Sequence, residues 1–371
     1  MKKTIHCILI GCAVASMTTS CSDDPDDNKK DEPKSYSALY VLDEGGFGAG
    51  NASLDAYDLH TGTFTQDVYS SATGKRLGDT GSDLQYHNGC LFAVMNGSGK
   101  VIVTDVYMQS SVAEISIESP RKICFNGDKA YVSSFTGGEN GKGSVKEIDL
   151  NTYTVTKNIP VSYEPEGVAV HENRLYVANS CGYHLTLTDD SYISVIALSD
   201  YSELPHIDLH VVNLENILFD SKGHLWVSSR GNYSDVPSRL YRIDRSAGNV
   251  YNDVYTYNMP CSNMTATPGR LYFYASVWDN SQYKNINTFR SINLNTLDVE
   301  TSSYISTDAA GGIQNPYGLA VDRFTGDIFI SDACDYTNGG KLFCFDKNGA
   351  LKHEFTTGVN PGHLTLVPAA D

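Results

Sequence analysis

The chain has 371 residues, 41% hydrophobic and 19% charged, which is enough for a large core in one or two domains. Its formal net charge is −17 and no basic patch stands out. Nucleic acid is therefore not expected as a partner, because a phosphate backbone needs clustered Lys and Arg. After the N-terminus there is no apolar run of about twenty residues, so no helical membrane span is expected.

The first segment, residues 1–20, has the pattern of a signal peptide. Lys2 and Lys3 provide the positive start, and an apolar stretch of secretory length follows over 5–17. The sequence TTSC then places small residues directly before Cys21, as at a lipoprotein signal-peptidase site, so we expect Cys21 to be lipidated. The LIGC box at 9–12 is the alternative, but it leaves too short an apolar run before it.

Residues 21–36 are predicted to be a lipidated start and a flexible acidic tether. The run SDDPDD after Cys21 resembles the export signal of surface lipoproteins in some Gram-negative gut anaerobes; a merely solvated linker is the alternative. We therefore expect a protein anchored by lipid to the outer membrane and facing the cell exterior. Residues 37–371 form the predicted globular domain.

Six cysteines remain after cleavage and lipidation. They follow no CxxC or Cys/His metal spacing, so no metal site is expected, and their disulfide pairing stays open. The six are Cys90, Cys124, Cys181, Cys261, Cys334 and Cys344.

A repeat organises the rest of the chain. A segment of the form L-Y-V-x-x occurs seven times, as in ALYVLDE at the start and RLYVANS near the middle. Most copies follow an inner-strand pattern such as EGVAVHE and precede a third strand such as SYISVIAL, with short turns between. The spacing of the copies is that of four-stranded propeller blades, and the many Tyr and Gly residues are typical of short strands and tight turns.

The two chain ends are expected to share one blade. The first copy, ALYVLDE, has no inner strand before it, while the run PGHLTLVP at 361–368 is left over at the C-terminal end. Placing that run inside the first blade gives seven complete antiparallel blades and leaves no exposed sheet edge. The sequence therefore predicts an all-β, seven-bladed β-propeller; a pair of β-sandwiches would not explain the missing and spare strands.

The segments LYVANS, ISVIAL and PEGVAV resemble those of YncE-like, surface-layer-type seven-bladed propellers. With the CSDDPDD start and the Tyr-rich, acidic composition, the chain most resembles the BtuG-type cobalamin-binding surface lipoproteins. The resemblance implies capture of cobalamin (vitamin B12) or related corrinoids and delivery to a TonB-dependent transporter of BtuB type. Cobalamin would be a bound ligand rather than a cofactor, and the protein would not be an enzyme.

The loops between second and third strands are long and emerge on one face, where binding residues usually sit. Aromatic rings with polar edges suit a flat, amide-fringed corrinoid, and would suit a sugar nearly as well. Arg230 is the best phosphate donor among the loop residues. The predicted ligand-binding residues are Phe47, Phe135, Asn179, Tyr183, His184, Arg230, Tyr233, Trp278, Tyr283, Asp332 and Tyr336. Connections between blades add to the same face Tyr163, Glu164, Glu166, Asn263, Asn315, Tyr317 and His363.

Glycan binding and enzymatic activity are the alternatives. Propellers host lactonases, lyases and quinoproteins, but the chain has two Trp in total, no adjacent cysteines and no GxSxG motif. Glu166, Asn263 and Asn315 could imitate the metal-binding set of a lactonase, although nothing in their local sequence is distinctive. A binding protein without catalytic residues is the favoured interpretation.

Overall fold

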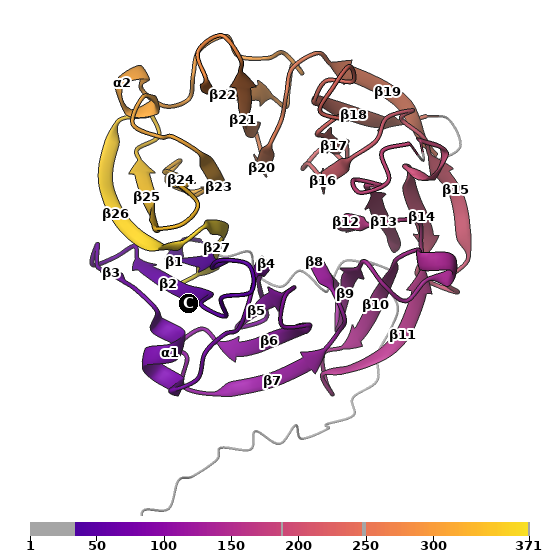
Figure 1. Cartoon of the computed structure of the whole chain (residues 1–371), viewed down its shortest axis with the longest axis horizontal. Helices are drawn as coiled ribbons and strands as arrows, with labels where there is room; N and C mark the ends of the chain where they lie inside the picture. Colours follow the sequence, from indigo (N-terminus) through magenta and orange to yellow (C-terminus); the bar gives the residue numbers. More distant parts are fainter. Residues whose placement is uncertain (1–33, 187, 247–249, 370–371) are drawn as a thin grey trace, which may run out of the picture.

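The computed structural model describes residues 34–186, 188–246 and 250–369. These residues form seven antiparallel sheets arranged as blades around one axis (Figure 1). The predicted seven-bladed propeller is therefore confirmed. The predicted signal peptide and Cys21 lie outside the described residues, so both stay predictions from the sequence.

The blades follow one another around the ring, and the strands of each run in order from the inner to the outer position. Blade one contains β27 (Pro361–Pro368), β1 (Tyr36–Asp43), β2 (Ser53–Asp58) and β3 (Phe64–Thr65). Blade two contains β4 (Gly81–His87), β5 (Cys90–Met95), β6 (Lys100–Asp105) and β7 (Ser111–Ser116). Blade three contains β8 (Pro120–Asn126), β9 (Lys129–Ser134), β10 (Ser144–Asp149) and β11 (Thr154–Pro160). Blade four contains β12 (Pro165–His171), β13 (Arg174–Asn179), β14 (Ile193–Ala197) and β15 (Glu203–Ile207).

The second half of the ring continues in the same order. Blade five contains β16 (Leu214–Phe219), β17 (Leu225–Ser229), β18 (Arg239–Arg245) and β19 (Tyr251–Tyr257). Blade six contains β20 (Asn263–Thr267), β21 (Arg270–Asp279) and β22 (Lys284–Asn293). Blade seven contains β23 (Pro316–Val321), β24 (Ile328–Asp332), β25 (Gly339–Phe345) and β26 (Leu351–Val359). Short helices lie in the connections, namely α1 (Val68–Thr73), α2 (Thr307–Ala310) and two 3-10 turns at Glu139–Gly141 and Thr188–Asp190. In the described part of the chain, no helix has both the length and the apolar character needed to cross a membrane.

The hydrophobic core lies between neighbouring blades. Seven clusters of buried apolar side chains fill the seven interfaces, one cluster for each pair of adjacent sheets. Between blades five and six, for example, Trp226 packs with Leu271 and Phe273. The L-Y-V segments form the second strands and contribute side chains to every one of these clusters, because β-branched and aromatic residues fit a pleated, buried sheet surface. Each buried Leu or Phe side chain contributes about 1.5–3 kcal/mol, which holds the blades together.

The C-terminal strand closes the ring as predicted. β27 pairs with β1 in antiparallel register, with Leu39 opposite Leu366 and Val41 opposite Leu364. Figure 1 shows the yellow end of the chain beside the indigo start. The innermost strand of blade one therefore comes from the opposite end of the sequence to its three partners.

Blade six departs from the predicted pattern in two ways. Its sheet has three regular strands, and the outer position is marked by a single bridge between Ile292 and Val299. In addition, the sequence predicts a long loop over 277–287, but this segment is a hairpin, because β21 and β22 pair out to Asp279 and Lys284. The segment has too few alternating apolar residues to indicate a strand, and it is the pairing with its own partner that keeps it extended.

A substitution at Gly167 tests how tightly the inner strands pack. A methyl group added there would lie 2.4 Å from the backbone carbonyl oxygen of Glu215, which belongs to the next blade. We expect Gly167→Ala to lower the free energy of unfolding by about 1–3 kcal/mol, as overpacking usually does. Gly269→Ala is the matched control, because nothing lies within 4 Å of its added methyl group. Equal stability of the two variants in chemical denaturation would contradict close packing of blades four and five.

Candidate functional site

A large cavity lies on the axis of the propeller. Its volume is about 1230 Å³, and all seven inner strands contribute to its wall. Residues beyond the inner strands extend this wall, among them Tyr233 and Tyr336 in loops and Trp278 in the hairpin of β21 and β22. This is larger than a typical pocket for a small molecule, which measures roughly 300–1,000 Å³.

Irregular pairing at the start of the inner strands directs polar side chains into this cavity. In blade three, Pro120 pairs with Ser134 and Ile123 with Val132, so two residues, Arg121 and Lys122, lie opposite one. Such a β-bulge bends the strand and frees side chains from the alternating pattern of the sheet. The same interruption follows the first residue of β4, β12, β16 and β23, and it occurs near Pro361 in β27.

Serine side chains of the second strands support two of these bulges. Ser133 Oγ accepts a hydrogen bond of 3.0 Å from the backbone N–H of Lys122, and Ser228 Oγ accepts one of 3.1 Å from Asn216. The Ser133 hydroxyl in turn donates to the carbonyl oxygen of Glu166 in the next blade at 2.7 Å. The bulged conformation is thus held by side chains that are themselves buried.

The two arginines that line the cavity, Arg121 and Arg230, are each held by a glutamate. The Arg121 guanidinium donates to both carboxylate oxygens of Glu166, at 3.1 and 2.9 Å. Arg230 makes the same two-point contact with Glu215. Such paired, forked contacts fix both side chains and balance their charges at the cavity wall.

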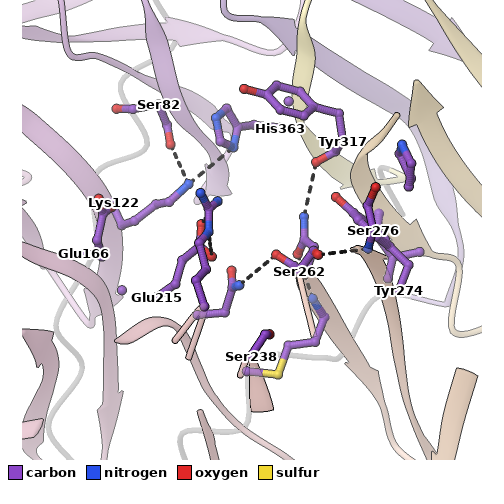
Figure 2. Close-up of a pocket in the computed structure, with 18 of the residues that line it drawn as sticks. Ser82, Lys122, Glu166, Glu215, Ser238, Ser262, Tyr274, Ser276, Tyr317 and His363 are labelled. Carbon is purple, nitrogen blue, oxygen red and sulfur yellow. Dashed lines mark hydrogen bonds and ion pairs between the residues drawn. The ribbon is translucent and has the colours of Figure 1, made fainter. Parts of the chain in front are cut away.

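A series of polar contacts links five residues around the axis, and Figure 2 shows the part from Ser82 through Lys122 to His363. Lys122 Nζ donates to the carbonyl oxygen of Ser82 at 2.6 Å and lies 3.4 Å from Nδ1 of His363. His363 Nε2 lies 3.2 Å from Oε1 of Glu44. The Tyr317 hydroxyl donates to the other oxygen of Glu44 at 2.9 Å.

Burial and neighbouring charges set the protonation states of His363, Glu44 and Tyr317. Burial, and then the positive charge of Lys122, lower the pKa of His363, so this imidazole is neutral at pH 7. Burial works against ionisation of Glu44 as well, but the contacts from His363 and Tyr317 outweigh it and hold the pKa of Glu44 below its ordinary value. Burial and the charge of Glu44 raise the pKa of Tyr317, so its hydroxyl keeps its proton.

Aromatic and amide side chains complete the cavity. Tyr233, Trp278 and Tyr336 are 70%, 55% and 46% exposed, which is unusual for side chains of this size and leaves their rings available for contact. Tyr336 packs edge-on against Tyr317, with 5.8 Å between the ring centroids. The amides of Asn216, Asn263, Asn280 and Asn285 also line the cavity.

Of the predicted ligand-binding residues, the cavity brings together Arg230, Tyr233, Trp278 and Tyr336. The others lie elsewhere. Phe135 stacks on Arg121, whose guanidinium carbon lies 4.9 Å from the ring centroid, and it meets the ring of Tyr183 edge-on. Phe47, Tyr183 and Tyr283 are more than 80% exposed, outside the cavity wall.

Three further predicted residues, Asn179, Asp332 and His184, lie outside the cavity wall and have partners in the loops. Asn179 is fully buried and bonds the backbone of Ser162 and Tyr192. Asp332 is buried too, and it accepts backbone N–H groups from Gln314, Asn315 and Cys334. His184 contacts the carboxylate of Glu164, which also accepts the backbone N–H of Tyr183. These contacts stabilise the loops.

Several residues at the starts of the inner strands line the cavity but are not among the residues predicted from the loops. Among the blade connections it does place Glu166, Asn263, Tyr317 and His363 on the correct face, and all four line the cavity. A usable signal is present, since strands predicted to be buried begin with polar residues. The missed residues are Glu44, Ser82, Asp83, Arg121, Lys122, Glu215 and Asn216.

The lactonase-like set does not converge on one centre. Glu166 is held by Arg121. Asn315 donates to the carbonyl oxygen of Cys334 at 2.6 Å and accepts from Asn285, and it does not line the cavity. No cluster of three or more metal-ligating side chains occurs among the described residues, and the six cysteines there are free thiols.

Comparisons with known proteins agree with the fold. A family model described as a domain of unknown function (DUF5074) matches residues 37–357. No curated protein matches the chain in sequence. Among solved structures, a quinonprotein alcohol dehydrogenase-like protein from Bacteroides thetaiotaomicron is similar, with 14% identity, a TM-score of 0.64 and coverage of 91% of this chain and 79% of that one.

Two further structures show the same likeness. Kuenenia stuttgartiensis hydrazine synthase has 15% identity and a TM-score of 0.62, covering 78% of this chain and 96% of the other. A proposed 6-phosphogluconolactonase from Bacteroides fragilis has 12% identity and a TM-score of 0.60, covering 93% and 100%. At these identities the likeness concerns the fold alone, because one propeller scaffold carries many functions.

Proposed function

The chain belongs to the DUF5074 family, and we propose that it is a binding protein that captures cobalamin or a related corrinoid in its axial cavity. The observation that carries this proposal is the cavity of about 1230 Å³, walled by charged pairs, amides and exposed aromatic rings. A corrinoid is a broad, flat macrocycle fringed with carboxamides. Tyr233, Trp278 and Tyr336 offer flat apolar faces, and the four asparagines offer amide partners for the fringe.

The direct test is binding of cyanocobalamin to residues 34–371, which include every described strand. We expect a tight one-to-one complex in calorimetry and comigration of the red vitamin with the protein in gel filtration. Absence of heat and of comigration would contradict the proposal. A signal on a glycan array instead would favour a sugar ligand, since exposed aromatic rings also stack on sugars.

Trp278 is the strongest single contact candidate, because its ring is large, lines the cavity and is 55% exposed. We expect Trp278→Ala to weaken cyanocobalamin binding by about tenfold or more, the effect typical of an aromatic residue that contributes strongly to binding. Tyr107→Ala is the matched control, since that ring is 72% exposed but lies outside the cavity wall. Equal losses in the two variants would argue against binding at the axis.

Delivery to a TonB-dependent transporter of BtuB type is the second part of the proposal. The net charge of −17 would steer the protein toward a basic rim on such a partner, and the lipid anchor predicted at Cys21 would keep both on one membrane surface. The expected result is a complex whose association rate falls as salt is added. Association insensitive to salt would remove this support.

A further inference from the structure

The positive charges of the axial cavity are not equally matched. Arg121 and Arg230 each face a glutamate that takes up two of their donors. Lys122 is different, because no carboxylate oxygen of the described residues lies within 4.0 Å of its Nζ. Its contacts are the carbonyl oxygen of Ser82 and the Nδ1 atom of His363, and both partners are neutral.

The two carboxylates that could pair with Lys122, those of Glu44 and Asp83, accept hydrogen bonds from other donors. Glu44 accepts from the Tyr317 hydroxyl at 2.9 Å. Asp83 accepts the backbone N–H groups of Leu84 and Ile123, each at 2.9 Å. Neither is free to turn toward Lys122 without giving up a buried hydrogen bond, which is costly.

Lys122 is the donor and His363 the acceptor in the contact between them. A neutral imidazole offers one acceptor nitrogen, and beside an ammonium that acceptor is Nδ1. An ammonium has three N–H groups, and two are accounted for by Ser82 and His363. Lys122 lines the cavity, so its third N–H is available to a bound molecule.

We infer that Lys122 is a subsite for one anionic oxygen of the ligand, and that a phosphodiester is the group it recognises. This inference rests on the proposed function, since the nucleotide loop of cobalamin carries a single phosphodiester monoanion. A ligand with one negative charge can pair with the Lys122 ammonium, which has no carboxylate partner among the described residues. A ligand with several charges would also meet Glu44, Glu166 and Glu215 in the same cavity. A carboxylate could supply the same kind of oxygen, so the test has to separate the two anions.

The first experiment compares cyanocobalamin with dicyanocobinamide, which keeps the corrin ring but lacks the nucleotide loop and its phosphodiester. We expect Lys122→Met to weaken cyanocobalamin binding by about tenfold to a hundredfold and to leave dicyanocobinamide binding unchanged. Lys122→Arg, which keeps the charge, should restore most of the affinity. Lys100→Met is the control, since Lys100 pairs with Glu114 away from the cavity. Equal losses for both corrinoids would overturn the inference, because they would mean general damage to the wall.

The second experiment does not depend on a corrinoid. Lysine is isotope-labelled during expression, which leaves all three N–H groups of each ammonium in place, and the side-chain signal absent from Lys122→Met identifies Lys122 in NMR spectra. We expect dimethyl phosphate, a monoanion, to shift this signal, and expect neutral trimethyl phosphate not to shift it. A larger shift with acetate than with dimethyl phosphate would overturn the choice of phosphodiester, and no shift with either anion would overturn the subsite. If the wild-type protein binds neither corrinoid, the proposed function fails, and this measurement still decides the subsite.

Discussion

A chain that ends at Val359, and therefore lacks β27, is expected not to fold. β27 supplies the inner strand of blade one, and its loss would leave β1 with an unpaired edge and expose Leu39 and Val41, which are fully buried. Exposed strand edges of this kind favour aggregation. The expected result is the loss of the cooperative thermal transition and aggregation in gel filtration.

The matched control is a chain that ends at Ala369, which keeps every described strand and should unfold like the full chain. Adding a synthetic peptide of residues 360–369 to the shortened chain should restore part of the transition, because a strand can be donated from outside. A shortened chain that unfolds cooperatively at the wild-type temperature would show that closure by β27 is not required.

Replacing Asp43 by Asn is expected to stabilise the protein at pH 8 far more than at pH 5. Asp43 and Asp55 are both fully buried on neighbouring strands, β1 and β2. Burial, and then the charge of Asp55, raise the pKa of Asp43 well above its ordinary value, and burial raises the pKa of Asp55 to about 6. Asp43 Oδ1 has no hydrogen-bond partner among the described residues, which fits two carboxyl groups that share a proton.

The direction of the pH dependence of stability follows from the number of protons bound in each state. Raised pKa values mean that the folded state holds more protons than the unfolded state, so stability falls as the pH rises from about 4 through about 6 and stays reduced above. A shift of this size corresponds to about 3 kcal/mol, as an order of magnitude. An amide at position 43 supplies a permanent N–H in place of the shared proton and removes this loss.

The measurement is chemical denaturation of wild type and Asp43→Asn between pH 5 and pH 8, analysed as the difference between the two proteins. The difference matters because His363, whose pKa is lowered, acts the other way and reduces stability as the pH falls. Asp128→Asn, at an exposed turn, is the control and should change little at any pH. A pH-independent difference for Asp43→Asn would contradict the shared proton.

The sequence is sufficient to predict the fold because the same pattern repeats along the chain. The chain has seven L-Y-V segments, lacks an inner strand at its start and has a spare strand at its end. Only a seven-bladed ring closed by the C-terminal strand accounts for all three features, and this is the observed arrangement. Four of the predicted binding residues, including Tyr233 and Trp278, also line the cavity. What the sequence could not fix is the register, since the bulge that directs Arg121 and Lys122 inward depends on the pairing of β8 with β9.

The remaining predicted residues lie on loops or at strand ends, away from the cavity wall. Phe47 and Tyr283 do lie on exposed segments, but exposure alone does not bring a side chain to the axis. Asn179 and Asp332 begin loops and hold their backbones, a role that polar residues at strand ends often have. Distinguishing a loop-stabilising Asn from a binding one needs its partners, which are distant in sequence.

The bulges at the inner strands have an implication for protein engineering. The bulged side chains, such as Arg121, Lys122, Glu166 and Glu215, take little part in the packing between blades, which relies on the apolar clusters farther out. Recognition and folding are therefore encoded at largely separate positions. A combinatorial library restricted to the bulged positions, leaving glycines such as Gly167 intact, should yield mostly folded proteins with altered ligand preferences. The propeller would then serve as a reprogrammable receptor whose selectivity is changed without redesigning its core.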